Sequence, residues 1–492
     1  MTPDQEALYR QALDEIKTIS VAGSSPLDTS DLSDLLRQHG LVTASIDPRN
    51  NTITGYTAAG VAAVNSLAKT FRPALSHHSS RVSNVTLANV MRRDILQTWR
   101  ERGASQPEKS DFDTFERAIA EWLGAFTQVR QHLVPCTIYP FAIPSFDVGP
   151  VTFRHFSELP TEGSGISREE FWPKAPPLWR QWCRDVWAAI RRRPVEREKI
   201  GGFQFSRFAQ FATERAAPWV AFVKVTGRPP DESIRAADLL SDIALAAIQL
   251  VSPSKDMRAI TRASARTSPA WRADMSWTED AGFSPGVQNL TPALTRSPLM
   301  TDKHIREVGP SLRSMGNRLS AFLDGSSSVP DLEEAWCNAA YWYHEALAET
   351  LDTVAVAKLE TAIEVLLRAA SLSGSKRRLH ESFEVFLGLT GADLIGTGKS
   401  LTVEQFIEAI TTARSRVLHG TWPTIQFDLP ANKSGQTISY EDVEELTRIL
   451  LLEFSVWLDE YIATGSAIDG TEAFFSWIRS ARLAAATSQA AP

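Results

Sequence analysis

From residue 331 onward, apolar residues return at helical spacing in one segment after another, and this pattern constrains the fold more than any other feature of the chain. It runs through residues 331–390 and 401–463 with one gap between them. The pattern predicts an all-α unit over residues 331–480, followed by a flexible tail at residues 481–492. A stretch rich in Gly, Ser and Pro at residues 325–330 predicts the boundary that precedes this unit.

The beginning of the chain mixes strand and helix patterns. Strands are predicted near residues 16–23 and 41–47 with a helix between them, and residues 111–131 favour a further helix. Residues 134–159 combine Pro, Gly, aromatic and β-branched side chains, which favours strands and turns. We therefore expect a mixed α/β region at residues 1–130.

The middle of the chain predicts a second mixed region. Residues 219–226 resemble a buried strand, a helix is expected at residues 231–250, and another helical pattern covers residues 302–323. Residues 131–324 are thus expected to form a β-containing sensor or regulatory region with helices. Overall the sequence predicts an α+β protein, in which a mixed α/β N-terminal region precedes an all-α helical bundle.

Charge is unevenly distributed along the chain. The 51 Lys and Arg and 58 Asp and Glu give a formal net charge of −7. Residues 331–492 carry about −11 of this, which leaves about +4 on the first 330 residues. The negative net charge argues against a protein built around a large basic surface. The hydrophobic content of 43% argues against a largely disordered chain.

The cysteines and the N-terminus indicate the compartment. Cys136, Cys183 and Cys337 lie far apart without a CxxC spacing, so no disulfide framework, zinc site or other cofactor is expected. The N-terminus has no basic start followed by an apolar run, and no segment reaches about 18 uninterrupted apolar residues. These features predict a soluble cytoplasmic protein without a membrane partner.

The most informative segment is FIEAITTARSRVLHGTWP, at residues 406–423. At about 100° per residue, Arg414 falls inside the apolar arc of its helix, whereas Arg416 points away from it. His419 is expected at the helix terminus, because Gly420 is a natural residue to end a helix. The apolar arc itself is predicted to contain Val403, Phe406, Ile407, Ile410, Ala413, Val417 and Leu418.

Arg414 and His419 suit metal-free RNA cleavage. A guanidinium holds a phosphate and stabilises the charge that develops on it, while an imidazole transfers protons near neutral pH. Two structural alternatives remain: the arginine pairs with a carboxylate of a neighbouring helix, or the histidine complements the helix dipole.

The segment ARSRVLHG, at residues 413–420, closely resembles the Arg-x4-His signature of HEPN domains, above all the Apea-like branch. The resemblance extends upstream through AWCNAAYWYHEALAE and KLETAIEVLLRAASLSGSKRRLHESFEVFLGL, and covers roughly residues 331–465. It implies an α-helical bundle that dimerises, two Arg/His pairs that meet across the dimer groove, and metal-independent endoribonuclease activity. Because residues five apart on a helix lie about 140° apart, a partner chain would also help to aim both side chains at one phosphate.

The resemblance also implies roles for individual residues. Arg414 would bind the scissile phosphate, and His419 would act as acid or base or position the attacking hydroxyl. Ser415 and Glu364 are candidates for support, although Glu364 fits a solvated or salt-bridged position equally well. The candidate RNA contacts are Arg416, Lys376, Arg377 and Arg378.

Several other signals are weaker. GTGKS, at residues 396–400, lacks the first glycine of a phosphate loop, and the pair Arg72 and His77 is interrupted by Pro73. Two basic groups are more typical of solvated faces than of RNA contacts. The first comprises Arg191, Arg192, Arg193, Arg197 and Lys199, and the second Arg258, Arg262, Arg266 and Arg272.

The resemblance implies a toxin or anti-phage abortive-infection effector that cleaves RNA as a homodimer or higher homo-oligomer. A phage-derived or other trigger is expected to act at the N-terminal region. In one alternative, the helical domain is a non-catalytic dimerisation or nucleotide-binding module that serves an N-terminal sensor. In another, the N-terminal region is itself an enzyme or ligand sensor, although it lacks phosphate-loop glycines.

Overall fold

The computed structural model describes most of the chain and divides into two compact units. Unit 1 comprises residues 1–130 and 225–235, and unit 2 comprises residues 131–224 and 236–492. The described residues are 1–20, 29–47, 52–71, 82–102, 107–125, 129–156, 207–208, 210–212, 214–252, 255–265, 271–278, 282–289, 297–369, 371–395, 401–423, 429–432 and 435–489.

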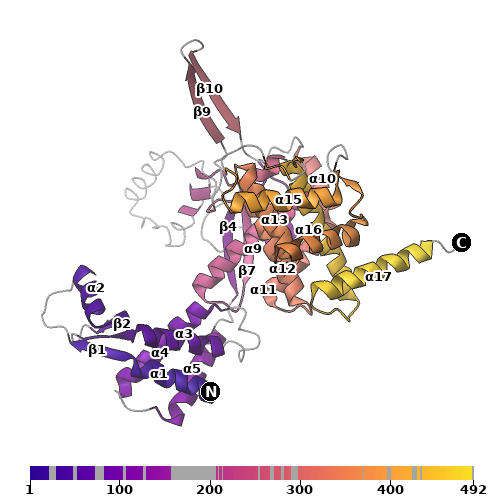
Figure 1. Ribbon diagram of the computed structural model, residues 1–492. Helices are drawn as coiled ribbons and strands as arrows, with labels where there is room; N and C mark the ends of the chain where they lie inside the picture. The colour runs from indigo at the N-terminus through magenta and orange to yellow at the C-terminus, as the bar shows by residue number, and fades with distance from the viewer. Residues whose placement is uncertain are drawn as a thin grey trace, which may run out of the picture. The chain divides into compact units, whose positions relative to one another are not determined.

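Unit 1 contains a small antiparallel sheet and helices (Figure 1). The sheet has the order β1-β3-β2, and the predicted strand–helix–strand opening is confirmed. Its elements are α1 (Pro3–Asp14), β1 (Ile16–Ser20), α2 (Thr29–Gln38), β2 (Leu41–Asp47), β3 (Thr52–Thr57), α3 (Ala58–Phe71), α4 (Asn84–Arg102) and α5 (Lys109–Gly124).

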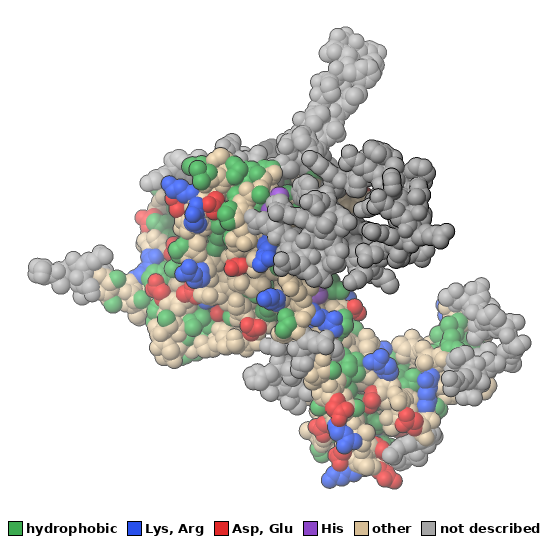
Figure 2. Space-filling model, turned by 180° about the vertical axis from the view of Figure 1, so that it is seen from behind, with side chains coloured by type: hydrophobic (Ala, Val, Ile, Leu, Met, Phe, Trp, Pro, Cys, Tyr) green, Lys and Arg blue, Asp and Glu red, His purple; other side chains and the backbone are tan. Residues whose placement is uncertain are grey.

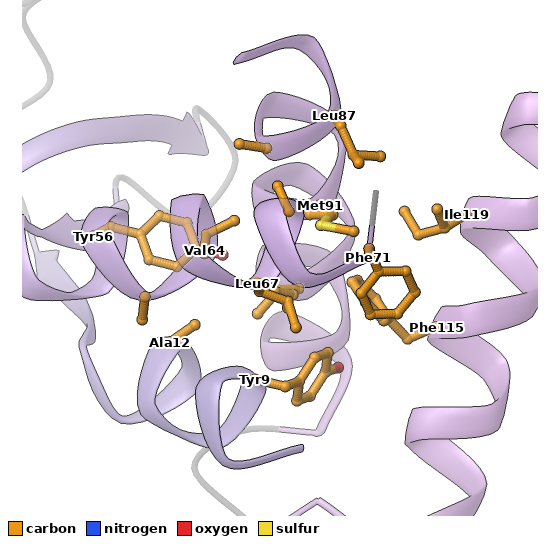
Figure 3. Packing of buried hydrophobic residues seen from close by; sticks show 14 of the residues in the cluster. Tyr9, Ala12, Tyr56, Val64, Leu67, Phe71, Leu87, Met91, Phe115 and Ile119 are labelled. Carbon is orange, nitrogen blue, oxygen red and sulfur yellow. The ribbon is translucent and has the colours of Figure 1, made fainter. Parts of the chain in front are cut away.

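The core of unit 1 lies where α1, α3, α4 and α5 meet the inner side of β3 (Figure 3). Tyr9, Phe71 and Phe115 form edge-to-face aromatic pairs, with ring centroids 4.9 Å apart for Tyr9 and Phe115. Val64 and Met91 are fully buried beside them. Tight packing of this kind makes the adjoining face of the sheet rigid.

Unit 2 begins with a five-stranded sheet in the order β5-β6-β7-β4-β8. The strands and turns predicted for residues 134–159, the buried strand near residue 219 and the helix after it are all present. The elements are β4 (Arg130–Thr137), β5 (Phe146–Val148), β6 (Val151–His155), β7 (Trp219–Val225), α9 (Pro230–Val251), a 3-10 turn η4 (Lys255–Ala259), β8 (Thr261–Arg262) and the hairpin β9 (Trp271–Thr278) with β10 (Gly282–Asn289).

The helical part of unit 2 follows directly. The chain is therefore an α+β protein with a helical C-terminal region, as predicted. Its elements are α10 (Pro298–Glu307), α11 (Gly309–Asp324), α12 (Pro330–Leu347), α13 (Asp352–Leu366), α14 (Leu372–Ser382), a π-helical turn η5 (Phe383–Leu387), β11 (Leu394–Ile395), β12 (Leu401–Thr402), α15 (Val403–Leu418), α16 (Tyr440–Ala463) and α17 (Thr471–Gln489).

Three details of the helical region differ from the expectation. The single helix predicted at residues 302–323 is divided into α10 and α11. The first turn of α11, which begins at Gly309, contains Pro310, a residue that is tolerated at the start of a helix and disrupts its interior. The segment expected to be a tail from residue 481 is helical up to Gln489. Residues 331–480 lie in the same compact unit as residues 131–224 and 236–324, although a boundary was expected near residues 325–330.

Close packing of α11 accounts for the missing boundary. A Cβ atom added to Gly316 on α11 would lie 2.3 Å from the backbone nitrogen of Gly149, in the turn between β5 and β6. On another side of α11, Arg318 Nε lies 3.0 Å from Glu333 Oε2 on α12, and both side chains are almost fully buried. The helix before the predicted boundary is therefore fixed to elements on both sides of it.

No helix in the described part of the chain is long and apolar enough to cross a membrane. On the face of the molecule in Figure 2, Lys and Arg side chains are interspersed with Asp and Glu.

Candidate active site at the end of helix α15

Helix α15 begins and ends as its sequence predicts. The hydroxyl of Thr402 accepts a hydrogen bond from the backbone nitrogen of Gln405 at 3.2 Å, and the Gln405 side chain accepts one from the Thr402 backbone at 3.0 Å. At the other end, the His419 backbone donates to the Ser415 carbonyl at 3.0 Å. Gly420 then adopts a left-handed φ of 68°, which suits a residue without a side chain. The expectation that His419 occupies a helix terminus is confirmed.

The buried face of α15 contains most of the predicted apolar arc. Val403, Ile410 and Ala413 are fully buried, and Val417 is 9% exposed. Leu418 differs from the expectation because its exposure is 60%. It is the last residue of the helix, where an arc drawn on a helical wheel no longer guarantees a neighbour to pack against.

Arg414 is held by two glutamates of α13. Its Nε lies 2.7 Å from Glu360 Oε2, and its Nη2 lies 2.6 Å from Glu364 Oε2. Its Nη1 donates a hydrogen bond to Glu364 Oε1 at 3.1 Å. The pairing with Glu364 is therefore bidentate, the geometry in which a guanidinium binds a carboxylate or a phosphate most specifically.

Burial differs across this cluster. The Glu360 side chain is completely buried, that of Glu364 is 15% exposed and that of Arg414 is 25% exposed. Burial, with a contribution from the Glu364 charge, raises the pKa of Glu360 to about 8, although Arg414 lowers it. At neutral pH the Glu360 carboxyl is thus mainly protonated, and Arg414 and Glu364 form the charged pair.

His419 lies outside this cluster. Its side chain is exposed at the end of α15, and within the described residues its imidazole makes no hydrogen bond. The Arg414 guanidinium contacts Glu360 and Glu364 on α13. The structure therefore does not bring His419 and Arg414 together in one intrachain cluster. Arg414 is therefore oriented within the chain, whereas His419 is available to a ligand or to a second copy.

The residues next to Arg414 have different surroundings. Ser415 and Arg416 are half-buried. The Arg416 carbonyl accepts backbone hydrogen bonds from Thr421 at 3.0 Å and Trp422 at 3.1 Å, so the chain folds back onto the end of α15. This turn fixes the backbone on both sides of His419.

The three basic residues predicted on α14 are not equivalent. Arg378 donates hydrogen bonds to Glu381 at 2.8 Å and Glu472 at 2.6 Å, and its side chain is only 11% exposed. Arg377 is 63% exposed, although it lies 3.8 Å from Glu472. Lys376 is half-buried and has no ion pair in the part of α14 and its neighbours that the structure describes. Arg378 thus stabilises the fold, whereas Arg377 and Lys376 remain candidates for RNA contact.

Two arginines of the second basic group are also engaged in packing. Arg258 lies 3.9 Å from the centre of the Tyr440 ring and 3.6 Å from Asp352. Arg262 donates two hydrogen bonds to Asp242, at 2.6 and 2.9 Å. These contacts agree with a structural role for both residues.

Other sequence signals fall outside the described side chains. They are Arg72, His77, Cys183, Arg191, Arg192, Arg193, Arg197, Lys199, Arg266, Arg272 and the loop at residues 396–400. In the described part of the chain, Cys136 and Cys337 are free and buried, and no group of three or more His, Cys, Asp or Glu is placed to hold a metal ion.

Glu360 was not among the site residues predicted from the sequence. Its signal was present, because Glu360 and Glu364 are four residues apart and therefore lie on the same face of α13. The pattern alone did not say which helix that face would meet.

Comparisons with known proteins give no relative. No protein-family model matches the chain, and no curated protein or solved structure matches it at a significant level.

Proposed function

We propose that the protein is a metal-independent endoribonuclease whose site combines Arg414 and His419, and that it acts as a toxin or anti-phage effector. The observation that carries this proposal is the placement of the two side chains at the end of α15. Arg414 is oriented by two carboxylates while a quarter of its side chain stays exposed, and an exposed imidazole ends the same helix. This supplies a phosphate-binding fork and a proton-transfer group.

The chemistry requires no group beyond these two and the RNA. The His419 imidazole accepts the proton of a ribose 2′-hydroxyl, and the 2′-oxygen attacks the adjacent phosphorus. The bond from phosphorus to the 5′-oxygen breaks, and the departing oxygen takes up the proton held by the His419 imidazolium, directly or through a water molecule. The products are a 2′,3′-cyclic phosphate and a 5′-hydroxyl end. Arg414 stabilises the negative charge that grows on the phosphate oxygens during the attack.

Glu364 must share Arg414 with the phosphate. A phosphate and a carboxylate occupy the same bidentate position on a guanidinium, so an RNA phosphate either displaces Glu364 or uses the remaining Nη hydrogens. Glu360, completely buried and mainly protonated at neutral pH, stays in place in both cases. We assign both glutamates as positioning residues.

A second copy of the chain would complete the site. Arg414 and His419 lie five residues apart, and their side chains leave the helix about 140° apart. Leu418, with an exposure of 60%, puts apolar surface directly beside His419. In a symmetric dimer joined at the ends of α15, His419 of one copy would approach Arg414 of the other.

The alternative function is a non-catalytic helical scaffold, and one observation favours it. Both glutamates that contact Arg414 come from its own chain, and the ion pair with Glu364 is already bidentate without a ligand. If that is its whole role, substitution of Arg414 lowers stability, and substitution of His419 changes nothing.

RNA cleavage in the presence of EDTA tests the proposal. The wild type, Arg414→Ala, His419→Ala and His39→Ala are compared at equal folded content, and His39 serves as a control because it is also an exposed histidine. We expect both site variants to lose activity and the control to keep it. Loss of cleavage when the 2′-hydroxyl is replaced by hydrogen identifies the attacking group.

His419→Ala separates catalysis from scaffolding. An exposed side chain without a described hydrogen bond should change the unfolding free energy by no more than about 0.5 kcal/mol. Wild-type protein that cuts no RNA, or site variants that cut as well as wild type, would disprove the nuclease proposal.

The dimer is tested separately by Leu418→Glu and sedimentation. We expect the wild type to sediment as a dimer and the variant as a monomer with reduced activity. A fully active monomer would contradict the composite site while leaving the nuclease proposal intact.

A further inference from the structure

A pocket in unit 1 contains three arginines and no acidic side chain among the described residues that line it. Its volume is about 490 Å³, within the range of about 300–1,000 Å³ that is usual for small-molecule sites. One wall is the edge of the sheet, with Thr43 and Ser45 on β2. The other is helix α4, with Arg92, Arg93 and Arg100.

Among the described residues, no carboxylate lies within salt-bridge distance of Arg92, Arg93 or Arg100, although Asp94 on the same helix is close enough for Arg93 to lower its pKa. Arg92 donates to the side chain of Asn89 and to the Ala88 carbonyl, and Arg100 donates to the Ser45 carbonyl at 3.4 Å. This differs from Arg414, whose charge is matched by a carboxylate. Three guanidiniums on one wall of a cavity, with no salt bridge in the described part of the chain, attract an anion with several charges.

The sheet is shaped at the same place. The pairing of β2 with β3 shifts register between Leu41 and Thr43, which marks a bulge. A Cβ atom added to Gly55 on β3 would lie 2.1 Å from the Thr43 carbonyl, so the strands come this close only because Gly55 has no side chain. The Thr43 hydroxyl oxygen is buried and has no hydrogen-bond partner in the described structure. Bulges of this kind redirect side chains next to binding sites.

The floor of the pocket is rigid. Tyr56 is 2% exposed and packs in the core of unit 1 (Figure 3), and its hydroxyl donates to the Arg92 carbonyl at 2.8 Å. This hydrogen bond holds the backbone of α4 against β3 at Arg92. The site is therefore largely formed before a ligand arrives, which lowers the entropic cost of binding.

We propose that this pocket binds a small phosphorylated ligand of the nucleotide class. Arg92, Arg93 and Arg100 would hold the phosphates, because guanidiniums match phosphate oxygens in pairs. The Asn89 amide nitrogen, the Thr43 hydroxyl and the Gln97 carbonyl would bind the sugar or base. The Gln97 side-chain nitrogen already donates a hydrogen bond to Glu101 at 3.0 Å. The side-chain carbonyl oxygen of Gln97 is therefore the atom that would accept a hydrogen bond from the ligand.

The shape of the site favours a small ligand over an RNA strand. The arginines line one wall of a single cavity that Tyr56 and the core close on another side, whereas a strand needs a basic track along which several phosphates can follow one another. Arg93 and Arg100 are seven residues apart, or about 10 Å along the helix, a span that suits one nucleotide with its phosphates.

Calorimetric titration of the full chain tests the site. The titrants are ATP, ADP, pyrophosphate, adenosine and a ten-nucleotide single-stranded RNA. The variant Arg93→Gln/Arg100→Gln removes two charges from exposed positions, so it should fold normally. The control Arg117→Gln removes an exposed arginine from α5 of the same unit, away from the lining residues. Thermal unfolding checks that all variants are folded.

We expect one ADP or ATP to bind per chain, and the double variant to weaken binding about 100-fold, or about tenfold for each charge–phosphate contact. Arg117→Gln should bind as wild type, and adenosine should bind far more weakly than ADP. The proposal is overturned if no nucleotide binds, if the double variant binds as wild type, if pyrophosphate binds as tightly as ADP, or if the RNA alone binds. None of these results depends on nuclease activity.

Discussion

Glu360 and Arg414 lie 2.7 Å apart, yet the glutamate holds a proton at neutral pH, because burial raises its pKa to about 8. The neighbouring Glu364 supplies the negative charge that matches the guanidinium. The raised pKa of Glu360 leads to the first prediction.

Stability of the wild type should fall as pH rises through the range set by Glu360. The folded state keeps a proton between the ordinary pKa of 4.5 and the folded value of about 8, whereas the unfolded chain loses it. The variant Glu360→Gln lacks this ionisation, so its free energy of unfolding relative to wild type should increase between about pH 5 and pH 8.

Urea unfolding across that pH range measures this difference. Glu404→Gln, on the exposed first turn of α15, is the matched control and should follow the wild type. Parallel curves for wild type and Glu360→Gln would show that Glu360 titrates normally.

The variant Arg414→Lys tests whether the planar geometry of the Arg414 guanidinium contributes to stability and activity beyond its positive charge. An ammonium group can satisfy only part of the contacts that Arg414 makes with Glu360 and Glu364, so stability should fall by about 1–3 kcal/mol. RNA cleavage should fall by about 100-fold, because the bidentate contact with the phosphate is lost. Urea unfolding and single-turnover cleavage measure the two effects, and a fully active lysine variant would argue against bidentate phosphate binding.

His344 should make the protein less stable in mild acid. It is buried in unit 2, where its Nδ1 lies 2.8 Å from Gln249 Oε1, and burial lowers its pKa below 6.5. Asp242, 3.8 Å away, opposes this shift, but its carboxylate is already bound by Arg262, so burial prevails. The unfolded chain therefore binds a proton that the folded state resists, and stability falls as pH drops below about 6.5.

Replacing the imidazole isolates its contribution. We expect His344→Gln to lower stability at pH 7 but to reduce its loss between about pH 7 and pH 5. The measurement is the urea midpoint at each pH, with the exposed His39→Gln as control. If wild type and His344→Gln lose the same stability on acidification, His344 is not the group that titrates.

Gly316→Ala should destabilise unit 2. The added methyl group would lie 2.3 Å from the Gly149 nitrogen, so α11 or the turn between β5 and β6 must move. Overpacking of this size typically costs about 1–3 kcal/mol. Gly309→Ala, on the same helix with nothing within 4 Å of the added atom, is the control. Equal unfolding midpoints for the two variants would show that α11 and the turn between β5 and β6 can move apart without loss of stability.

Local features of α15 could be predicted from the sequence. The capping box at Thr402, the end of the helix at His419 and the inward direction of Arg414 all depend on residues within one segment. The strand–helix–strand opening is local in the same sense. Such patterns specify an element and the face that it buries.

Features that join distant segments could not be predicted in this way. Glu360 and Arg414 are separated by more than fifty residues, and the wheel of each helix does not say which other helix it meets. The same holds for Gly149 and Gly316, whose contact removed the expected boundary. The pocket of unit 1 could not be predicted from the sequence either, because it forms only where α4 packs beside the edge strand β2.

If RNA binds at Arg414 as proposed, the position of Arg414 beside Glu360 would couple that binding to proton uptake. Arg414 lowers the pKa of Glu360, so a phosphate that draws the guanidinium away would let that pKa rise further. RNA binding near pH 8 would then be accompanied by proton uptake from the buffer, and affinity would decline in alkaline solution. Calorimetry in buffers with different ionisation enthalpies would count those protons directly.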